Sequence, residues 1–312
     1  GADLYFEAAV AGGIPVIRVL REALASDTVV ALRGIVNGTS NYILSRMREA
    51  GLSFEAALRE AQEKGYAEAD PSLDVGGGDA AHKLTILATL AFGAKVHPSQ
   101  IATEGIDQVA AIDMELAARF GYVIKPLAIA RSLPQGLDLR VHPALIPQSS
   151  VLASISGALN AIYLESKMLG PCLLSGAGAG ALPTAMSVVS DIVDVGRNLL
   201  HGASGRVPQR AFRGEALETR EVLDVGKLVT PYYLRFSVLD RPGVLARIAG
   251  VLGAFDVSIE QMVQQGRAAD TPVQVVMITH EAREANVRHA LREIHMLSGI
   301  VERTHALRIE RG

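Results

Sequence analysis

The sequence is poor in cysteine and close to neutral in charge. Cys172 is the only cysteine among 312 residues, which excludes a disulfide within the chain and a thiolate metal cluster. The formal net charge is -3, so no strong basic field exists to attract nucleic acid or an anionic membrane. We expect a reducing, cytoplasmic compartment, with small molecules and other protein chains as partners.

Long apolar runs are also missing. No uninterrupted stretch of about 18 apolar residues occurs, which argues against a membrane-spanning helix. The first twenty residues carry Asp3 and Glu7 and no basic leader, so they are not typical of a signal peptide. Because 49% of the residues are apolar, a chain of this length can fill the cores of two domains.

The first two hundred residues mix helical and strand periodicity. Apolar residues at helical spacing occur, in order, in Ile14–Ala25, Gly38–Ala50, Phe54–Lys64, Gly78–Phe92, Ile112–Phe120 and Pro183–Leu200. Strand patterns occur in Thr28–Val36, Val123–Arg131, Leu137–Val141 and Ala161–Ser166. We predict an α/β (α+β) domain over residues 1–202. The second and third of these strands are candidates for pairing across the two-fold axis of a dimer.

A polar stretch without clear periodicity, residues 203–230, connects this domain to a regular C-terminal module over 231–312. Strands are predicted at Tyr232–Asp240, Ser258–Gln264, Val273–His280 and His305–Glu310, and helices at Val244–Phe255 and Glu284–Met296. This order, βαββαβ, is that of a small ferredoxin-like sandwich.

The segment with the most chemistry is residues 65–84, GYAEADPSLDVGGGDAAHKL. Asp79 opens a helix and Lys83 follows one turn later on the same face. Such a pair is commonly a solvated salt bridge. The apolar residues that follow Lys83 predict a largely buried helix, however, and a lysine at its charged end would suit a proton donor and acceptor. His82 points about 100° away around the helix, which favours either a packing role or a supporting role behind the residues that contact the substrate.

Three further carboxylates, Glu68, Asp70 and Asp74, lie on the loop before this helix. They either cap the loop and keep it soluble or converge with Asp79 around a substrate that carries an ammonium group.

Four segments together resemble homoserine dehydrogenases: FEAAVAGGIP (6–15), GIVNGTSNYIL (34–44), residues 65–84, and GAGAGALPTA (176–185). The resemblance implies an oxidoreductase that interconverts aspartate 4-semialdehyde and homoserine with NADP or NAD, in threonine and methionine biosynthesis. Lys83 matches the catalytic lysine, and Glu68 and Asp79 match substrate-binding residues. Asp74 is a further candidate contact, and Gly65 matches a glycine beside the cofactor.

The two glycine-rich segments carry separate expectations. The resemblance implies a sodium ion held by main-chain oxygens of Glu7, Val10, Gly12 and Ile14, since oxygen ligands suit a hard cation. The second segment formally fits a dinucleotide fingerprint, but no strand ending in an acid follows it. Its turn is either a plain entry into a helix or a cofactor contact through Gly178 and Gly180.

The resemblance also implies a nucleotide-binding Rossmann domain that would precede residue 1, and we expect this chain to lack it. The choice between NAD and NADP would depend on that domain.

The C-terminal module resembles an ACT domain, which binds amino acids and regulates enzymes. Its LDRPG turn places Asp240 and Gly243 where free helix N–H groups could bind an effector carboxylate, with threonine as the expected effector. A helix cap without a ligand is the alternative. His280, His289 and His295 lack metal-ligand spacing and are predicted to be surface residues.

Two other functions compete with this interpretation. The chain could be a catalytically silent amino-acid sensor that serves regulation and dimerisation, although a sensor needs no lysine beside a carboxylate pocket. Another semialdehyde-handling dehydrogenase would use a reactive cysteine, whereas Cys172 has plain apolar neighbours. In either case we expect a homodimer or homotetramer.

Overall fold

The computed structural model describes residues 3–265 and 272–311, and the chain divides into two compact units. The first comprises the chain up to Ala111 together with Lys125–His142 and Ser150–Leu223. The second comprises Ile112–Ile124, Pro143–Ser149 and the chain from Asp224 onward. Among the helices of the described residues, none combines the length and the hydropathy that a membrane crossing needs.

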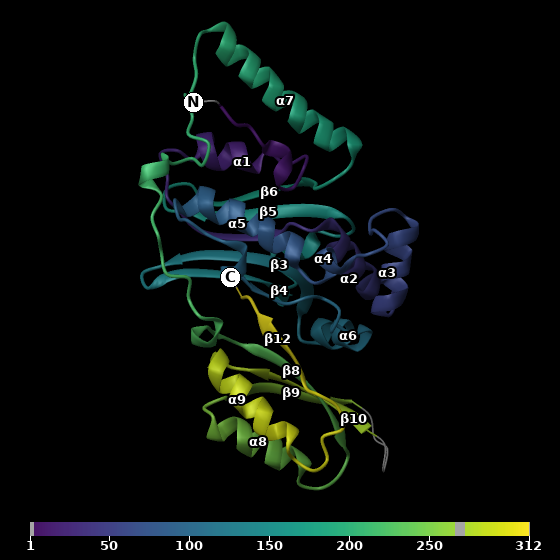
Figure 1. The fold of residues 1–312 in the computed structure, drawn as a ribbon. Helices are drawn as coiled ribbons and strands as arrows, with labels where there is room; N and C mark the ends of the chain where they lie inside the picture. Colours follow the sequence, from purple (N-terminus) through teal and green to yellow (C-terminus); the bar gives the residue numbers. More distant parts are fainter. Residues whose placement is uncertain (1–2, 266–271, 312) are drawn as a thin grey trace. The chain divides into compact units, whose positions relative to one another are not determined.

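A mostly antiparallel sheet organises the first unit (Figure 1). Its strands, in spatial order, are β6 (Gly170–Ala177), β5 (Leu159–Ser166), β1 (Val29–Ile35), β3 (Tyr122–Leu133) and β4 (Gly136–Pro147), with the short β2 (Ala102–Thr103) parallel to β4. The sequence pattern missed β6, because its glycine and proline residues dilute the strand signal. Since β3 lies between β1 and β4 within one chain, its predicted pairing across a two-fold axis is wrong.

Helices cover this sheet and close its core. The segment α1 (Val16–Arg18), which continues as the π-helix η2 (Val19–Ala23), packs with α5 (Gly78–Phe92). Figure 1 shows α5 lying across the sheet. The shared core is fully buried at Leu32, Leu84, Leu87, Ala128 and Ile162. The other elements are η1 (Glu7–Ala9), α2 (Gly38–Ala50), α3 (Phe54–Glu63), α4 (Ser72–Val75), η3 (Pro98–Gln100), η4 (Val151–Ser154) and α7 (Ala181–Leu200).

The ends of α2 and α5 follow from their capping residues. The Asn37 side chain accepts a hydrogen bond from the Ser40 N–H and begins α2, and Gly51 in the left-handed region ends it. Gly77 and Gly93 flank α5, both with positive φ. A side chain at Gly77 would be strained by its φ of 84° and would also press on Val141.

The second unit contains the predicted βαββαβ module, and this part of the fold prediction is confirmed. Its elements are β8 (Tyr232–Leu239), α8 (Val244–Ala254), β9 (Ile259–Gln265), β10 (Pro272–Thr279), α9 (Glu284–His295) and β12 (His305–Ile309). The sheet order is β12-β8-β10-β9, and α8 and α9 pack together over a core that includes Phe236, Ile248, Val275 and Ile294. The unit also holds α6 (Ala111–Arg119), η6 (Val225–Lys227), and the paired strands β7 (Val229–Thr230) and β11 (Ala282–Arg283).

The polar connection after α7 is hydrogen bonded to the first unit as far as Leu223, with the short η5 (Gly214–Ala216) within it. Glu218 donates its N–H to the Gly93 carbonyl at 2.9 Å and accepts from Lys95 at 2.8 Å. Leu137 donates to the Glu221 carbonyl at 2.8 Å. Main-chain pairing needs no apolar periodicity, which is why the sequence pattern showed only a connection here.

Candidate active site

The charged end of α5 carries the predicted lysine and carboxylate as a contacting pair. Lys83 Nζ donates to Asp79 Oδ2 at 2.7 Å and to the Val36 carbonyl at 3.0 Å. Both side chains are about three-quarters buried, with exposed fractions of 22% and 25%. One face of α5, which includes Ala80, Leu84 and Leu87, is buried in the core, so this pair lies where the buried part of the helix meets the surface.

Asn37, which the sequence reasoning did not single out, connects two of the predicted carboxylates. Its Nδ2 donates to Asp74 Oδ1 at 2.7 Å and to Asp79 Oδ2 at 2.8 Å. Asp74 lies on α4, Asp79 on α5, and Asn37 in the turn between β1 and α2. The convergence of Asp74 with Asp79 therefore depends on a residue from a third segment. The only available signal was that Asn37 stands in the GIVNGTSNYIL segment as a helix N-cap.

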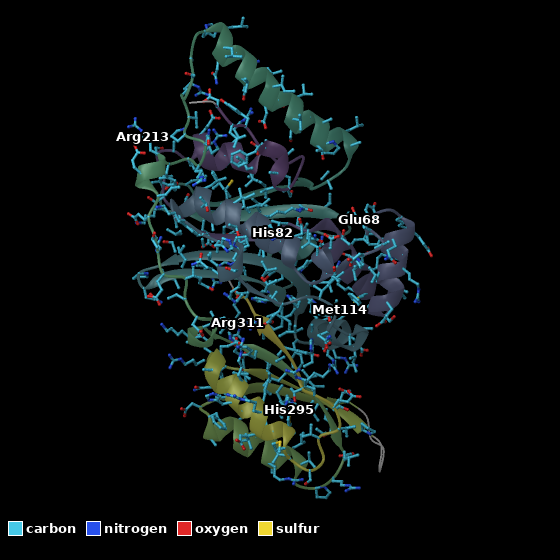
Figure 2. The ribbon with its side chains drawn as sticks, viewed as in Figure 1. Glu68, His82, Met114, Arg213, His295 and Arg311 are labelled. Carbon is cyan, nitrogen blue, oxygen red and sulfur yellow. The ribbon has the colours of Figure 1, made fainter. Side chains whose placement is uncertain are left out.

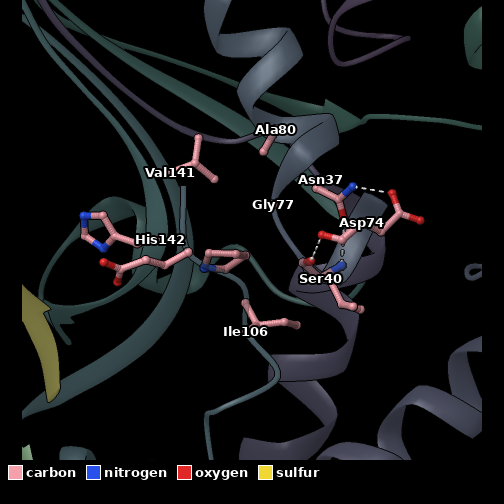
Figure 3. Close-up of a pocket in the computed structure, with 11 residues that line it drawn as sticks. Asn37, Ser40, Asp74, Gly77, Ala80, Ile106, Val141 and His142 are labelled. Carbon is pink, nitrogen blue, oxygen red and sulfur yellow. Dashed lines mark hydrogen bonds between the residues drawn. The ribbon is translucent and has the colours of Figure 1, made fainter. Parts of the chain in front are cut away.

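A small cavity lies beside this cluster (Figure 3). Asn37, Ser40 and Asp74 line it on one side, and the Ser40 hydroxyl donates to the Asp74 main-chain carbonyl at 3.0 Å. The remaining lining residues are Val75, Gly77, Ala80, Glu104, Ile106, Pro126, Val141 and His142. The apolar side chains among them, such as Val75, Ile106 and Val141, limit the access of solvent to the carboxylates and thereby strengthen the hydrogen bonds of the carboxylates.

The remaining predicted residues of the 65–84 segment do not join the cluster. Glu68 is exposed, and its carboxylate has no hydrogen bond among the described residues (Figure 2). Asp70 accepts from the Ser72 N–H at 3.1 Å, which is local loop capping. His82 is exposed, so it is not the packing residue that the sequence suggested.

The glycine-rich turn between β6 and α7 packs against the first loop of the chain. Gly13 donates its N–H to the Ala177 carbonyl at 3.0 Å, and the Ser187 hydroxyl on α7 donates to the Gly12 carbonyl at 2.6 Å. A Cβ at Gly178 would lie 2.1 Å from Cγ of the buried Asn160. The glycine at 178 is thus required by packing within the chain, whatever else the turn contacts.

Gly65 and Gly180 differ from Gly178 because their backbone is open to a ligand. Both have positive φ, 73° and 116°. A Cβ at Gly65 would meet nothing within 4 Å, and one at Gly180 would meet only Pro183. A flat cofactor could approach the main chain closely at both positions.

The loop predicted to hold a cation is built around a buried acid. Glu7 accepts hydrogen bonds from the N–H groups of Ile17 and Arg18 at 2.8 and 2.9 Å, and thereby caps α1. Burial raises the pKa of its carboxyl, although these two bonds act in the opposite direction. Among the residues that the structure describes, the Gly12 and Ile14 carbonyls each accept one hydrogen bond, which leaves a lone pair on each oxygen.

In the second unit, the LDRPG turn is exposed. Gly243 has a φ of 86° and precedes α8 without a side-chain cap, and a Cβ there would meet nothing within 4 Å. Gln264 donates to the Asp240 carboxylate at 3.3 Å. The expectation for His280 and His289 holds, since both are exposed, but His295 is half-buried and its Nε2 accepts from the Thr304 N–H at 3.0 Å (Figure 2).

Comparison with known proteins gives two family matches. The model of the family described as homoserine dehydrogenase matches residues 15–193, and the ACT domain model matches residues 232–298. The homoserine dehydrogenase of Neisseria gonorrhoeae is 44% identical over 305 residues, which cover 98% of this chain and 70% of that protein.

Solved structures give the same picture. The crystal structure of a homoserine dehydrogenase from Thiobacillus denitrificans is 45% identical, with a TM-score of 0.91, and the match covers 98% of this chain and 70% of that one. A hyperthermophilic archaeal homoserine dehydrogenase in complex with NADPH is 29% identical, with a TM-score of 0.54, over 63% of this chain and 56% of that one.

Proposed function

Since this chain belongs to the homoserine dehydrogenase family, we propose that Lys83 transfers the proton in the interconversion of L-aspartate 4-semialdehyde and L-homoserine. One observation carries the proposal: Lys83 is held by Asp79 and the Val36 carbonyl at the partly buried start of α5. A sensor without catalytic activity gives no reason for this arrangement.

The chemistry requires an acid that can also act as a base. Reduction adds a hydride to the aldehyde carbon, and the oxygen that gains charge must receive a proton. A bound nicotinamide cofactor supplies the hydride. The Lys83 ammonium donates the proton in this direction, and its neutral amine accepts the hydroxyl proton of homoserine in the reverse direction.

The substrate also carries an ammonium group, which acidic side chains can bind. Asp74 and Asp79 already lie together at the site, and the exposed Glu68 lies on the loop that leads to them. Two carboxylates beside one lysine leave an excess of negative charge, which favours a cationic group. We assign all three carboxylates to substrate binding.

The cofactor is NAD or NADP, and the chain offers backbone contacts for it. The open glycines Gly65 and Gly180 suit the close approach of a nucleotide, and α7 begins after Gly180 without a side-chain cap, so its first N–H groups point toward that turn. Gly178 supports this turn through its packing on Asn160. Main-chain oxygens of Glu7, Val10, Gly12 and Ile14 would hold a monovalent cation such as Na⁺, as hard oxygen donors can.

The ACT domain binds an amino-acid effector, and we propose threonine as that effector, with Asp240 and Gly243 in the binding turn. We also propose a cytoplasmic enzyme that assembles as a homodimer or homotetramer.

The test is Lys83→Ala in the complete enzyme. We expect turnover to fall about 10²- to 10⁴-fold with a smaller change in KM for homoserine, because proton transfer is lost in the transition state. Arg119→Ala is the control, since it removes another i,i+4 ion pair, 3.0 Å from Glu115 on α6 of the second unit. Near-normal turnover of Lys83→Ala would assign the proton transfer to another group.

A further inference from the structure

We propose that Asn37 is a positioning residue that sets the charge balance around Lys83, and this inference rests on the proton-transfer role proposed above. Asn37 is a neutral side chain held between two carboxylates, and it fixes the one that contacts the lysine. It acts on Lys83 through the Asp79 carboxylate.

The orientation of the Asn37 amide is fixed by the main chain. The side chain is 6% exposed, and its Oδ1 accepts from the Ser40 N–H at 2.8 Å as the cap of α2. An amide has one acceptor end and one donor end, so an oxygen committed to the cap forces Nδ2 to face the carboxylates. A carboxylate oxygen at the Nδ2 position would find only other acceptors.

The two hydrogens of Nδ2 are both used. They reach Asp74 Oδ1 at 2.7 Å and Asp79 Oδ2 at 2.8 Å. Two ionised oxygens this close to a single nitrogen would repel each other across a partly buried site. A donor shared between them offsets that repulsion without adding a charge.

Asn37 influences Lys83 through one oxygen atom, Oδ2 of Asp79. Asp79 Oδ2 accepts hydrogen bonds from both Asn37 and Lys83. The carboxylate therefore cannot rotate away from the lysine without breaking the hydrogen bond from the Asn37 side chain. The Val36 carbonyl, which precedes Asn37 in the chain, accepts a second Lys83 hydrogen. Among the described residues one ammonium hydrogen then remains for the substrate oxygen.

The charged groups around this cluster determine how the proton affinity of Lys83 should change when one of them is replaced. Asp79 lies on the helix of Lys83, and Asp74 on α4 is joined to it through Asn37. Glu104 and His142 line the adjoining cavity. Asn37→Asp keeps the cap oxygen but adds a third charge beside Asp79, which stabilises the protonated lysine. Asp74→Asn removes one charge and has the opposite effect.

The experiment is the pH profile of homoserine oxidation by the complete enzyme. The kcat of homoserine oxidation should rise with pH as Lys83 loses its proton. For Asn37→Asp, we expect the midpoint of this rise to move about one pH unit toward alkaline pH. At a fixed pH below the midpoint, the rate should then be about tenfold lower than that of the parent enzyme. For Asp74→Asn the midpoint should move toward acid pH. Asn198→Asp is the matched control, because the Asn198 side chain donates to the Tyr5 hydroxyl at the far end of α7 and its change of charge should leave the profile in place.

The outcomes separate this inference from the proposed function. Loss of turnover in Lys83→Ala together with an unshifted profile in both Asn37→Asp and Asp74→Asn would overturn the role of Asn37 and leave Lys83 in place. Normal turnover in Lys83→Ala would overturn the proposed function itself. Because aspartate is as good an N-cap as asparagine, Asn37→Asp is expected to fold, and the Asp74→Asn shift tests the charge balance independently.

Discussion

Lys125 on β3 shows how far burial lowers the pKa of a single side chain. Its side chain is 1% exposed, and Nζ donates to the Ile155 carbonyl. No ion pair to a carboxylate is found for it among the described residues. Burial lowers its pKa from 10.5 to about 8. At neutral pH the folded chain therefore holds a buried cation, which opposes folding.

We predict that Lys125→Met stabilises the first unit at pH 7 and that this gain shrinks as pH rises from about 8 to 10.5. In that window the unfolded lysine holds a proton that the folded one has released, so the stability of the parent increases with pH. A shift of this size corresponds to about 3 kcal/mol, reduced by the lost hydrogen bond. Urea denaturation at pH 7 and pH 10 measures the effect.

The exposed Lys95 provides the control, since Lys95→Met should change stability little at either pH. A destabilised Lys125→Met at pH 7 would mean that the hydrogen bond to Ile155 outweighs the cost of burying the charge.

At the scale of the elements, the buried Asp113 on α6 forms hydrogen bonds to two residues of β8. Asp113 is fully buried and accepts from the Tyr233 hydroxyl at 2.8 Å and from Arg235 Nε at 2.6 Å. These bonds join the βαββαβ module of the second unit to a helix that lies more than a hundred residues earlier in the sequence.

Asp113→Ala should lower the free energy of unfolding by about 3–5 kcal/mol, because it leaves the Arg235 guanidinium buried without its anion. Glu115→Ala is the control on the same helix. Its pair with Arg119 is about half exposed, so the expected change is within about 1 kcal/mol. Chemical denaturation compares the two, and equal effects would contradict the assignment of Asp113 as the link.

At the scale of the whole molecule, the two units have separate cores. The first holds the Lys83 cluster, and the second holds the ACT module with its exposed turn at Gly243. Regulation requires an effector that binds one global state of the enzyme better than another.

We predict that Gly243→Asp abolishes the binding of threonine, because it adds a negative charge and a side chain where the effector carboxylate would lie. Isothermal titration calorimetry of the chain with threonine measures the loss. Gly250→Asp places the same charge in the middle of α8, where a Cβ also meets nothing within 4 Å, and it should retain binding. If the parent chain binds no threonine at millimolar concentration, the effector is a different molecule.

The sequence by itself determined the elements and the local chemistry. Helical periodicity placed α2, α3 and α5, and the βαββαβ order defined the second unit. The pairing of Asp79 with Lys83 also followed, because residues four apart in a helix share a face whatever surrounds them.

Only the tertiary structure decided which distant groups meet. Asn37 bonds to Asp74 and Asp79 because the turn after β1 lies against α4 and α5, and Glu68 stays exposed although it is nearer to them in the sequence. The same holds for Asp113 with Arg235, and for Gly178 with Asn160. These contacts depend on how elements pack, and side-chain periodicity along one segment carries no information about its neighbours in space.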